Sequence, residues 1–288
     1  LGVPKELTPG EKRVGAIPET CRRLAAMGTK VLIEASAGEG AFFGDDEYRA
    51  AGAEVVADVE ELYRRANVVL KVKELHFNEA KKKHELEMMQ PGATLVCFIH
   101  PASPLNHDLV RRIAAKGITA LTMDSIPRMT RAQKMDALTA MSTVAGYKAV
   151  IMAADRFARF IPMTVTAVGT IPPAKVLVIG TGIVGLQALA TAKRLGGVVS
   201  AVDIRPDARE QAASLGAKVA GFDAPRELSV GDGGYARALP EEWLLKERAA
   251  LAPVVADSDI IICGALIPGE RAPVVITEEM VKGMRKGS

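Results

Sequence analysis

Short runs of apolar, β-branched residues alternate with longer segments in which apolar residues recur at helical spacing. In the N-terminal half the short runs predict strands at residues 30–34, 67–73, 94–99 and 118–123, with helices between them. This alternation is typical of an α/β domain that wraps helices around a largely parallel sheet.

A longer helical pattern follows. Residues 131–159 contain no proline and a single glycine, Gly146, and their apolar positions predict one long helix that joins two domains. We therefore expect an N-terminal α/β domain over residues 1–135 and a second domain over residues 136–288, entered by this linking helix.

The second domain repeats the alternation, with strands predicted at residues 176–179, 198–203, 217–220 and 259–263. A complete doubly wound dinucleotide-binding domain has six strands. The predicted fold class is therefore α/β, with two Rossmann-like domains joined by a long helix, and we expect the second, doubly wound fold to be truncated at its C-terminus.

Composition and charge narrow the function classes. The formal net charge is only +3, and basic residues are not interleaved with aromatic ones, so a nucleic-acid partner is not expected. Three cysteines lie far apart without metal-ligand spacing, which argues against zinc and against a disulfide framework. The long apolar run at residues 176–192 is broken by glycines, whereas a spanning helix needs about 20 apolar residues, so we expect no membrane span.

Candidate chemistry begins at the sequence Gly180-Thr-Gly182-Ile-Val-Gly185, which lies between a predicted buried strand and a predicted helix. In that context Gly180 allows a tight turn, Gly182 lets a pyrophosphate approach the backbone, and Gly185 lets helix and strand pack closely. The helix N-terminus would face the phosphates. The alternative is a glycine-rich turn without a ligand.

An acidic residue favours a dinucleotide-binding turn over a turn without a ligand. Asp203 ends the next predicted strand, about 20 residues after the glycine turn, where a carboxylate accepts hydrogen bonds from the adenosine ribose. Because this carboxylate would repel a 2′-phosphate, the pattern predicts NAD(H) rather than NADP(H). Arg205 is a contrary signal, since an arginine there can bind a 2′-phosphate or only cover the adenine.

The segment from Met123 to Tyr147, which contains Ile-Pro-Arg-Met-Thr-Arg-Ala-Gln-Lys-Met-Asp, closely resembles a stretch typical of the NAD(H)-binding domain of the NAD(P) transhydrogenase alpha subunit, in the alanine dehydrogenase/transhydrogenase family. Residues 164–175, Gly-Gly-Tyr-Ala at 233–236 and Ala-Leu-Ile-Pro-Gly at 265–269 extend the resemblance over nearly the whole chain.

The resemblance implies a set of nucleotide contacts. Arg128, Gln133 and Asp136 match family residues that face the nicotinamide, and Thr139 stands where the family has serine, which keeps the hydroxyl and adds a methyl. The resemblance also places Gly234 and Tyr235 in a mobile loop that closes over the nucleotide, and Leu266 beside it. The residues expected to bind the cofactor are Arg128, Met129, Thr130, Gln133, Asp136, Thr139, Gly180, Gly182, Ile183, Gly185, Asp203, Ile204, Arg205, Gly234, Tyr235 and Leu266.

The function that the resemblance implies is Re/Si-specific, proton-translocating transhydrogenation. Hydride would pass directly from NADH on this chain to NADP⁺ on a partner domain, so no side chain need act as acid, base or nucleophile, and no metal is expected. The implied partners are an NADP(H)-binding domain, a membrane domain and a second copy of this chain. The implied location is cytoplasmic, peripheral on the inner membrane through the partner, or on the matrix side in a mitochondrion.

Two alternatives remain. Alanine dehydrogenase resembles the same fold, and Arg13, Lys73 and His100 match its pyruvate-binding and acid/base positions. The transhydrogenase interpretation is favoured because the segments at 128–147 and 233–236 look different in alanine dehydrogenases. The other alternative is a catalytically idle NAD-sensing or assembly subunit, whose nucleotide crevice would lack one wall.

Overall fold

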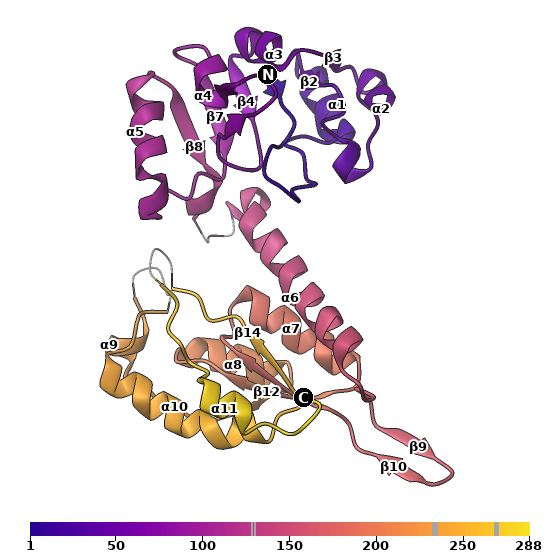
Figure 1. Ribbon diagram of the computed structural model, residues 1–288, viewed down its shortest axis with the longest axis vertical. Helices are drawn as coiled ribbons and strands as arrows, with labels where there is room; N and C mark the ends of the chain where they lie inside the picture. The colour runs from indigo at the N-terminus through magenta and orange to yellow at the C-terminus, as the bar shows by residue number, and fades with distance from the viewer. Residues whose placement is uncertain (128, 130, 232–235, 268–270) are drawn as a thin grey trace. The chain divides into compact units, whose positions relative to one another are not determined.

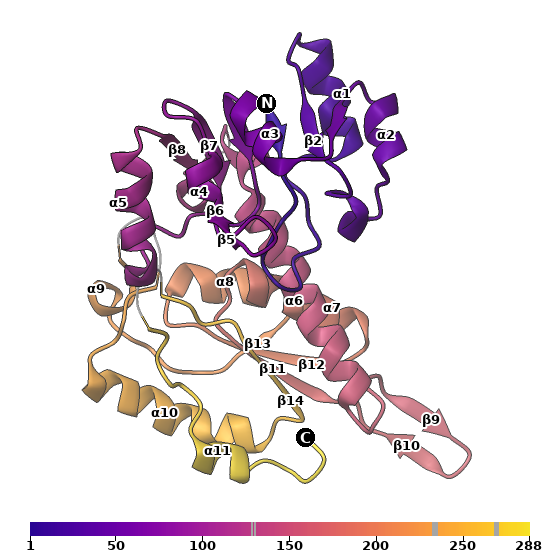
Figure 2. The ribbon, with the colours of Figure 1, turned by 45° about the horizontal axis from the view of Figure 1, so that its top comes forward.

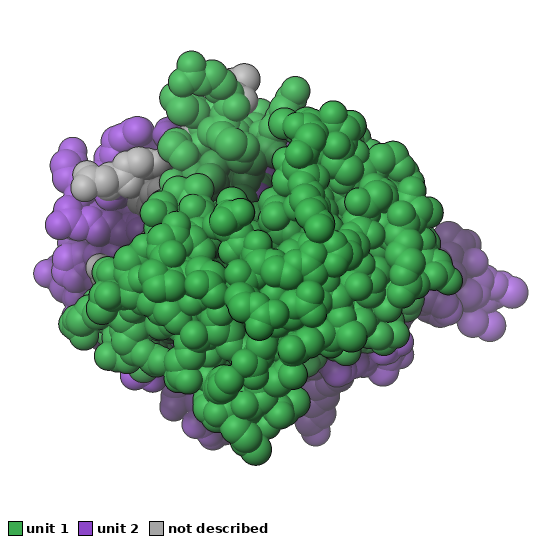
Figure 3. Space-filling view, turned by 90° about the horizontal axis from the view of Figure 1, so that it is seen from above, with its two compact units in different colours: residues 1–136 green, residues 137–288 purple. Residues whose placement is uncertain are grey.

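A computed structural model describes residues 1–288 except 128, 130, 232–235 and 268–270 (Figure 1). The chain divides into two compact units, which Figure 3 distinguishes by colour: unit 1 is Leu1–Asp136 and unit 2 is Ala137–Ser288.

Unit 1 is built on a six-stranded sheet in which every strand pair is parallel and the order is β3-β2-β1-β4-β7-β8. Its strands are β1 (Gly2–Val3), β2 (Leu32–Glu34), β3 (Glu54–Val56), β4 (Val68–Leu70), β7 (Thr94–Cys97) and β8 (Thr119–Thr122). The predicted parallel α/β architecture is confirmed. The sequence pattern missed β1, which has only two residues, and β3, whose first residue is the exposed Glu54, so that its apolar run is two residues long.

Helices cover both faces of this sheet. They are α1 (Pro18–Ala26), α2 (Asp45–Ala50), α3 (Val59–Arg65), α4 (Glu85–Met88) and α5 (His107–Ala115), with short 3-10 turns η1 (Glu39–Ala41), η2 (Pro104–Asn106), η3 (Met123–Ser125) and η4 (Gln133–Met135). One core joins Val3 and Ile33 to α1 and α2, and another joins Leu95 to Tyr63 of α3 and Ile113 of α5. A small antiparallel pair, β5 (Phe77–Asn78) and β6 (Lys83–His84), lies after β4.

Unit 2 opens with α6 (Ala137–Arg156), which is shorter than the helix expected over residues 131–159. That expectation was wrong at the N-terminal end, because Asp136 has a ψ of 77° and separates η4 from the helix. At Gly146 a Cβ would lie 2.2 Å from the carbonyl oxygen of Val184 on α7. Only glycine therefore allows α6 to pack this closely on α7 (Ile183–Arg194).

The sheet of unit 2 has four described strands in the order β13-β12-β11-β14, all parallel. They are β11 (Lys175–Ile179), β12 (Val198–Val202), β13 (Lys218–Val219) and β14 (Ile260–Cys263). The remaining helices are α8 (Pro206–Ser214), α9 (Arg226–Ser229), α10 (Glu241–Ala256) and α11 (Glu278–Lys282). Helices α6, α7 and α8 pack on one face, and α10 and α11 cover the other (Figure 2).

The β9–β10 hairpin and helix α6 of unit 2 carry exposed apolar side chains. A hairpin of β9 (Thr164–Thr166) and β10 (Gly169–Ile171) projects from the unit (Figure 1), and its Val165 and Val168 are 74% and 99% exposed. By length and composition alone α6 could cross a membrane, although the sequence pattern predicted no membrane span. One side of α6 packs against α7, whereas apolar residues on its other side, such as Val144 and Met152, are exposed.

Candidate dinucleotide-binding site

The glycine turn lies between β11 and α7. Gly180 has a φ of +83°, and a Cβ there would lie 2.7 Å from the backbone nitrogen of Ala265, so this position needs glycine for two separate reasons. A Cβ at Gly185 would lie 2.0 Å from the carbonyl oxygen of Gly180, whereas a Cβ at Gly182 would meet nothing within 4 Å. The two outer glycines therefore hold the turn together, and Gly182 leaves space open beside the start of α7.

The N-terminus of α7 is suited to an anion. The helix begins at Ile183, and its N-cap Gly182 offers no side chain to the first backbone N–H groups. Such N–H groups, together with the helix dipole, bind phosphates without any charged side chain. The open space at Gly182 leaves room for an anion beside these N–H groups.

Asp203 follows β12 and is only 6% exposed. Its Oδ2 accepts hydrogen bonds from the backbone nitrogen of Thr181 at 2.7 Å and from Nη2 of Arg205 at 2.8 Å, and its Oδ1 accepts one from Nε of Arg205 at 3.0 Å. Burial alone would raise the pKa of Asp203, but the hydrogen bonds and charge of Arg205 hold it below its ordinary value. The site therefore presents a carboxylate that stays ionised at neutral pH.

Arg205 is tied to this carboxylate by two side-chain hydrogen bonds. Much of its charge is therefore compensated inside the unit. Thr181, which sequence reasoning did not single out, is 1% exposed and also donates its hydroxyl to Asp203. Its position within the glycine turn was the available signal.

The other expected contacts differ in how far the structure describes them. Arg128, Thr130, Gly234 and Tyr235 lie outside the described residues. Met129 and Leu266 are exposed, at 53% and 71%, and Gln133 is exposed on η4. Asp136 ends unit 1 and Thr139 lies in the first turn of α6 in unit 2, where both are partly buried. Ile183 starts α7 and Ile204 follows Asp203 directly.

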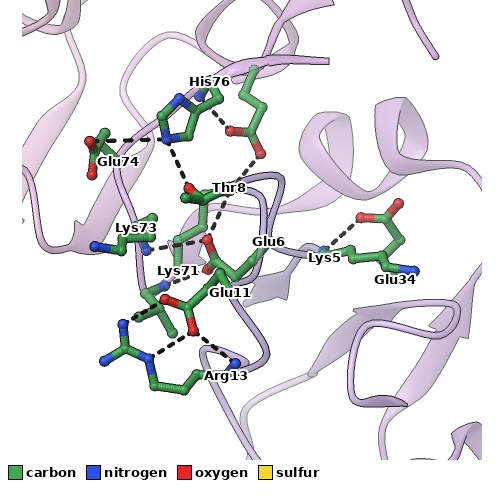
Figure 4. Close-up of polar contacts among 12 residues, drawn as sticks. Lys5, Glu6, Thr8, Glu11, Arg13, Glu34, Lys71, Lys73, Glu74 and His76 are labelled. Carbon is green, nitrogen blue, oxygen red and sulfur yellow. Dashed lines mark hydrogen bonds and ion pairs between the residues drawn. The ribbon is translucent and has the colours of Figure 1, made fainter. Parts of the chain in front are cut away.

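A second polar cluster lies in unit 1 at the carboxyl ends of β1 and β4 (Figure 4). Lys71 is fully buried, and its Nζ lies 2.7 Å from Oε1 of Glu85 and 3.6 Å from Oε2 of Glu6. Tyr63 donates its hydroxyl to the same Glu85 oxygen at 2.7 Å. The Glu6 carboxylate accepts the backbone N–H groups of residues 72 and 73. Burial raises the pKa of Glu6, against the opposing charge of Lys71.

The three oxo-acid candidates lie at the same edge of this sheet. Arg13 forms a two-bond pair with Glu11, at 2.8 Å and 2.6 Å, and this hydrogen bonding lowers the pKa of Glu11 to about 2. Lys73 follows β4 and its charge acts on Glu11. His100 follows β7 with a φ of +54°, and its Nδ1 lies 2.6 Å from Oδ1 of Asp124. Asp124, missed in the sequence, is thus the residue that orients His100.

No group of three or more potential metal ligands occurs among the residues that the structure describes.

Both units match known protein domains. Residues 2–145 match the alanine dehydrogenase/PNT N-terminal domain, and residues 149–288 match the alanine dehydrogenase/PNT C-terminal domain. The chain belongs to the alanine dehydrogenase/PNT family.

Within the alanine dehydrogenase/PNT family the chain is more similar to transhydrogenases than to alanine dehydrogenases. It is 44% identical over its whole length to an NAD(P) transhydrogenase subunit alpha protein of Rhodospirillum rubrum, of which it covers 74%. The alanine dehydrogenase of Bacillus subtilis is 31% identical, with 68% of that protein covered. A crystal structure of a transhydrogenase from Sinorhizobium meliloti superimposes with a TM-score of 0.82 at 39% identity, covering the whole chain and 76% of that structure. The resemblance expected from the sequence is confirmed, and membership of this family implies binding of a nicotinamide dinucleotide.

Proposed function

We propose that this chain is the NAD(H)-binding component of a Re/Si-specific, proton-translocating transhydrogenase, and that it exchanges hydride with NADP(H) held by a partner domain. The observation that carries the proposal is the buried, ionised Asp203 beside the glycine turn. A bound nicotinamide would supply the hydride chemistry. The residues of this chain bind and orient the dinucleotide and need not transfer a proton.

The site residues divide into two groups in this proposal. Gly180, Gly182 and Gly185 shape the phosphate turn, while Asp203 accepts the ribose hydroxyls and disfavours a 2′-phosphate. Gln133, Asp136 and Thr139, with Arg128, position the nicotinamide ring. Holding two reactants in near-attack geometry lowers a barrier by about 7–11 kcal/mol, so positioning alone can account for a large rate enhancement.

Asp203→Asn tests the nucleotide preference. The amide loses the charge that both the ribose hydroxyls and Arg205 use, and hydrogen bonds to charged groups contribute about 1.5–3 kcal/mol. We expect NADH affinity to fall by about 10-fold to 100-fold, while NADPH affinity rises because Arg205 is released. Fluorescence titration with both nucleotides measures this change, and equal losses for the two nucleotides would contradict it.

The transfer activity needs a partner. We expect the purified chain to bind NADH in preference to NADPH and to show no oxidation of NADH by an NADP⁺ analogue on its own. Adding a separately prepared NADP(H)-binding transhydrogenase domain should start hydride transfer, followed by absorbance. Binding of NADH without transfer in the mixture would instead support the idle, NAD-sensing or assembly role.

The partners in this proposal are an NADP(H)-binding domain and a membrane domain, which would hold the chain at the cytoplasmic or matrix face of an inner membrane. We also propose a homodimer, supported by the exposed apolar residues of the β9–β10 hairpin, Val165 and Val168, and of α6, Val144 and Met152. Sedimentation at micromolar concentration should give twice the monomer mass of 30.5 kDa. A monomer mass at micromolar concentration would contradict the proposed homodimer.

A second candidate function is alanine dehydrogenase, and the observation that favours it is the His100–Asp124 pair at 2.6 Å. An arginine for a carboxylate, a lysine for a carbonyl and an oriented histidine for proton transfer form a coherent oxo-acid site. Oxidation of NADH by the chain alone, dependent on both pyruvate and ammonium and lost in Lys73→Ala, would establish it.

A further inference from the structure

The buried side of α10 carries one acidic residue among apolar ones. Leu244, Glu247, Leu251 and Val255 are all buried, at the three- and four-residue spacing that places side chains on one helix face. Leu251 and Val255 belong to the core that also contains Val202 of β12. Glu247 is 5% exposed, and no hydrogen bond joins its carboxyl group to any residue that the structure describes.

The topology locates this acid along the sheet. The C-terminus of α10 leads through a short connection into β14, so the C-terminus lies near the starting edge of the parallel strands. Glu247 is one helical turn toward the N-terminus from Leu251, and therefore closer to the carboxyl edge, where Asp203 follows β12. Figure 2 shows α10 running along this face of the sheet.

We infer that Glu247 is a specificity-determining residue, whose carboxylate adds to that of Asp203 and strengthens the rejection of a 2′-phosphorylated dinucleotide as pH rises. This inference rests on the proposed binding of NAD(H) at the glycine turn. Leu251, one helical turn from Glu247, packs with Ile179 and Val202 at the carboxyl ends of β11 and β12, and Asp203 directly follows Val202. This placement brings the Glu247 charge close enough to act on Asp203, and it adds a second negative charge beside the proposed ribose subsite.

The charges around Glu247 set the pH range. Burial, and then the charge of Asp203, raise the pKa of Glu247 to about 7, opposed by the neighbouring Arg248. Asp203 itself is compensated by Arg205, and Arg248 donates to the carbonyl of Val274 and lies 3.5 Å from Glu241. Glu247 is therefore mostly protonated at pH 6 and mostly ionised above pH 8, while Asp203 stays ionised throughout.

Glu247→Gln removes this titration and keeps the shape of the side chain. The experiment measures dissociation constants of NADH and NADPH by fluorescence at pH 6.0, 7.0 and 8.5, for the wild type, Glu247→Gln and the control Glu242→Gln. The control removes an equal charge from an exposed position of the same helix. Because all variants meet the same ligand, titration of the 2′-phosphate itself cancels in the comparison.

We expect the NADPH dissociation constant of the wild type to equal that of Glu247→Gln at pH 6.0 and to exceed it by about tenfold at pH 8.5. NADH should bind all three proteins alike, and Glu242→Gln should follow the wild type. A ratio for NADPH that does not change with pH, or an equal change for NADH, overturns the inference while leaving NAD(H) binding intact. Failure of the wild type to bind NADH would overturn the proposed function, and this inference with it.

Discussion

Gly185→Ala is expected to abolish detectable NADH binding and to destabilise unit 2. The added Cβ would lie 2.0 Å from the carbonyl oxygen of Gly180 and 2.9 Å from its carbonyl carbon. Both are backbone atoms. The Gly180 nitrogen donates a hydrogen bond to the carbonyl oxygen of Val202 at 2.8 Å, so the backbone of the turn cannot move away without breaking that hydrogen bond. We expect α7 to shift, at a cost of about 1–3 kcal/mol or more, and its N-terminal N–H groups to leave the phosphate position.

Two further glycines serve as controls for this result. Gly182→Ala adds a methyl to open space, so it should keep wild-type stability yet weaken NADH binding by filling the space proposed for the pyrophosphate. Gly221→Ala also meets nothing within 4 Å and should change neither property. Urea unfolding followed by fluorescence of Trp243 in unit 2, together with NADH titration, separates the effects. Wild-type affinity in Gly185→Ala would show that the turn does not hold the nucleotide.

Lys71→Met is expected to cost unit 1 about 3–5 kcal/mol of unfolding free energy, because it leaves the buried carboxylates of Glu6 and Glu85 without their shared cation. Far-UV circular dichroism during urea unfolding reports the helices and strands of both units, whereas Trp243, the single tryptophan, reports unit 2 alone, so a transition that only the dichroism shows belongs to unit 1. We expect the first signal to shift and the second to move far less.

The loss in Lys71→Met should depend on pH. Burial raises the pKa of Glu6 even beside Lys71, whose charge lowers it, so removing the ammonium raises this pKa further. A folded-state pKa above the unfolded value means that the folded state binds more protons, and its stability falls as pH rises through the folded-state pKa. The difference from wild type should be smaller at pH 5 than at pH 8. Lys83→Met, which removes a partly exposed pair with Glu60, should cost less than about 1 kcal/mol. Similar losses of unfolding free energy in Lys71→Met and Lys83→Met would mean that the buried Lys71 network stabilises unit 1 no more than an exposed ion pair does.

The sequence could predict those features of the fold that repeat or that need a special residue. Buried parallel strands such as β11 are continuous β-branched runs, and the glycine turn needs glycine for reasons of contact and φ, so both have local signals. The start of α6 could not be predicted in this way. Asp136 is compatible with a helical pattern in the sequence, and only its ψ of 77° in the structure shows that the helix begins after it.

The network around Lys71 had no sequence signal for a different reason. Glu6, Lys71 and Glu85 come from separate elements, and only the pairing of β1 with β4 brings the first two together. Glu247 did carry a signal, an acid at an apolar position of an amphipathic helix, that could have been found by following the spacing of Leu244, Leu251 and Val255. The roles expected of Arg128, Gln133, Asp136 and Thr139 came from family resemblance and stay predictions.

The three cysteines differ in exposure, which allows selective labelling of one of them. Cys21 and Cys97 are buried, whereas Cys263 is exposed at the end of β14, on the same sheet edge as the glycine turn. A thiol-directed fluorophore or spin label should therefore attach at one position without any mutagenesis. Because desolvation raises the pKa of the Cys263 thiol, coupling should be carried out at alkaline pH, where more of it is thiolate. The attached group would then report nucleotide occupancy from within the unit that binds it.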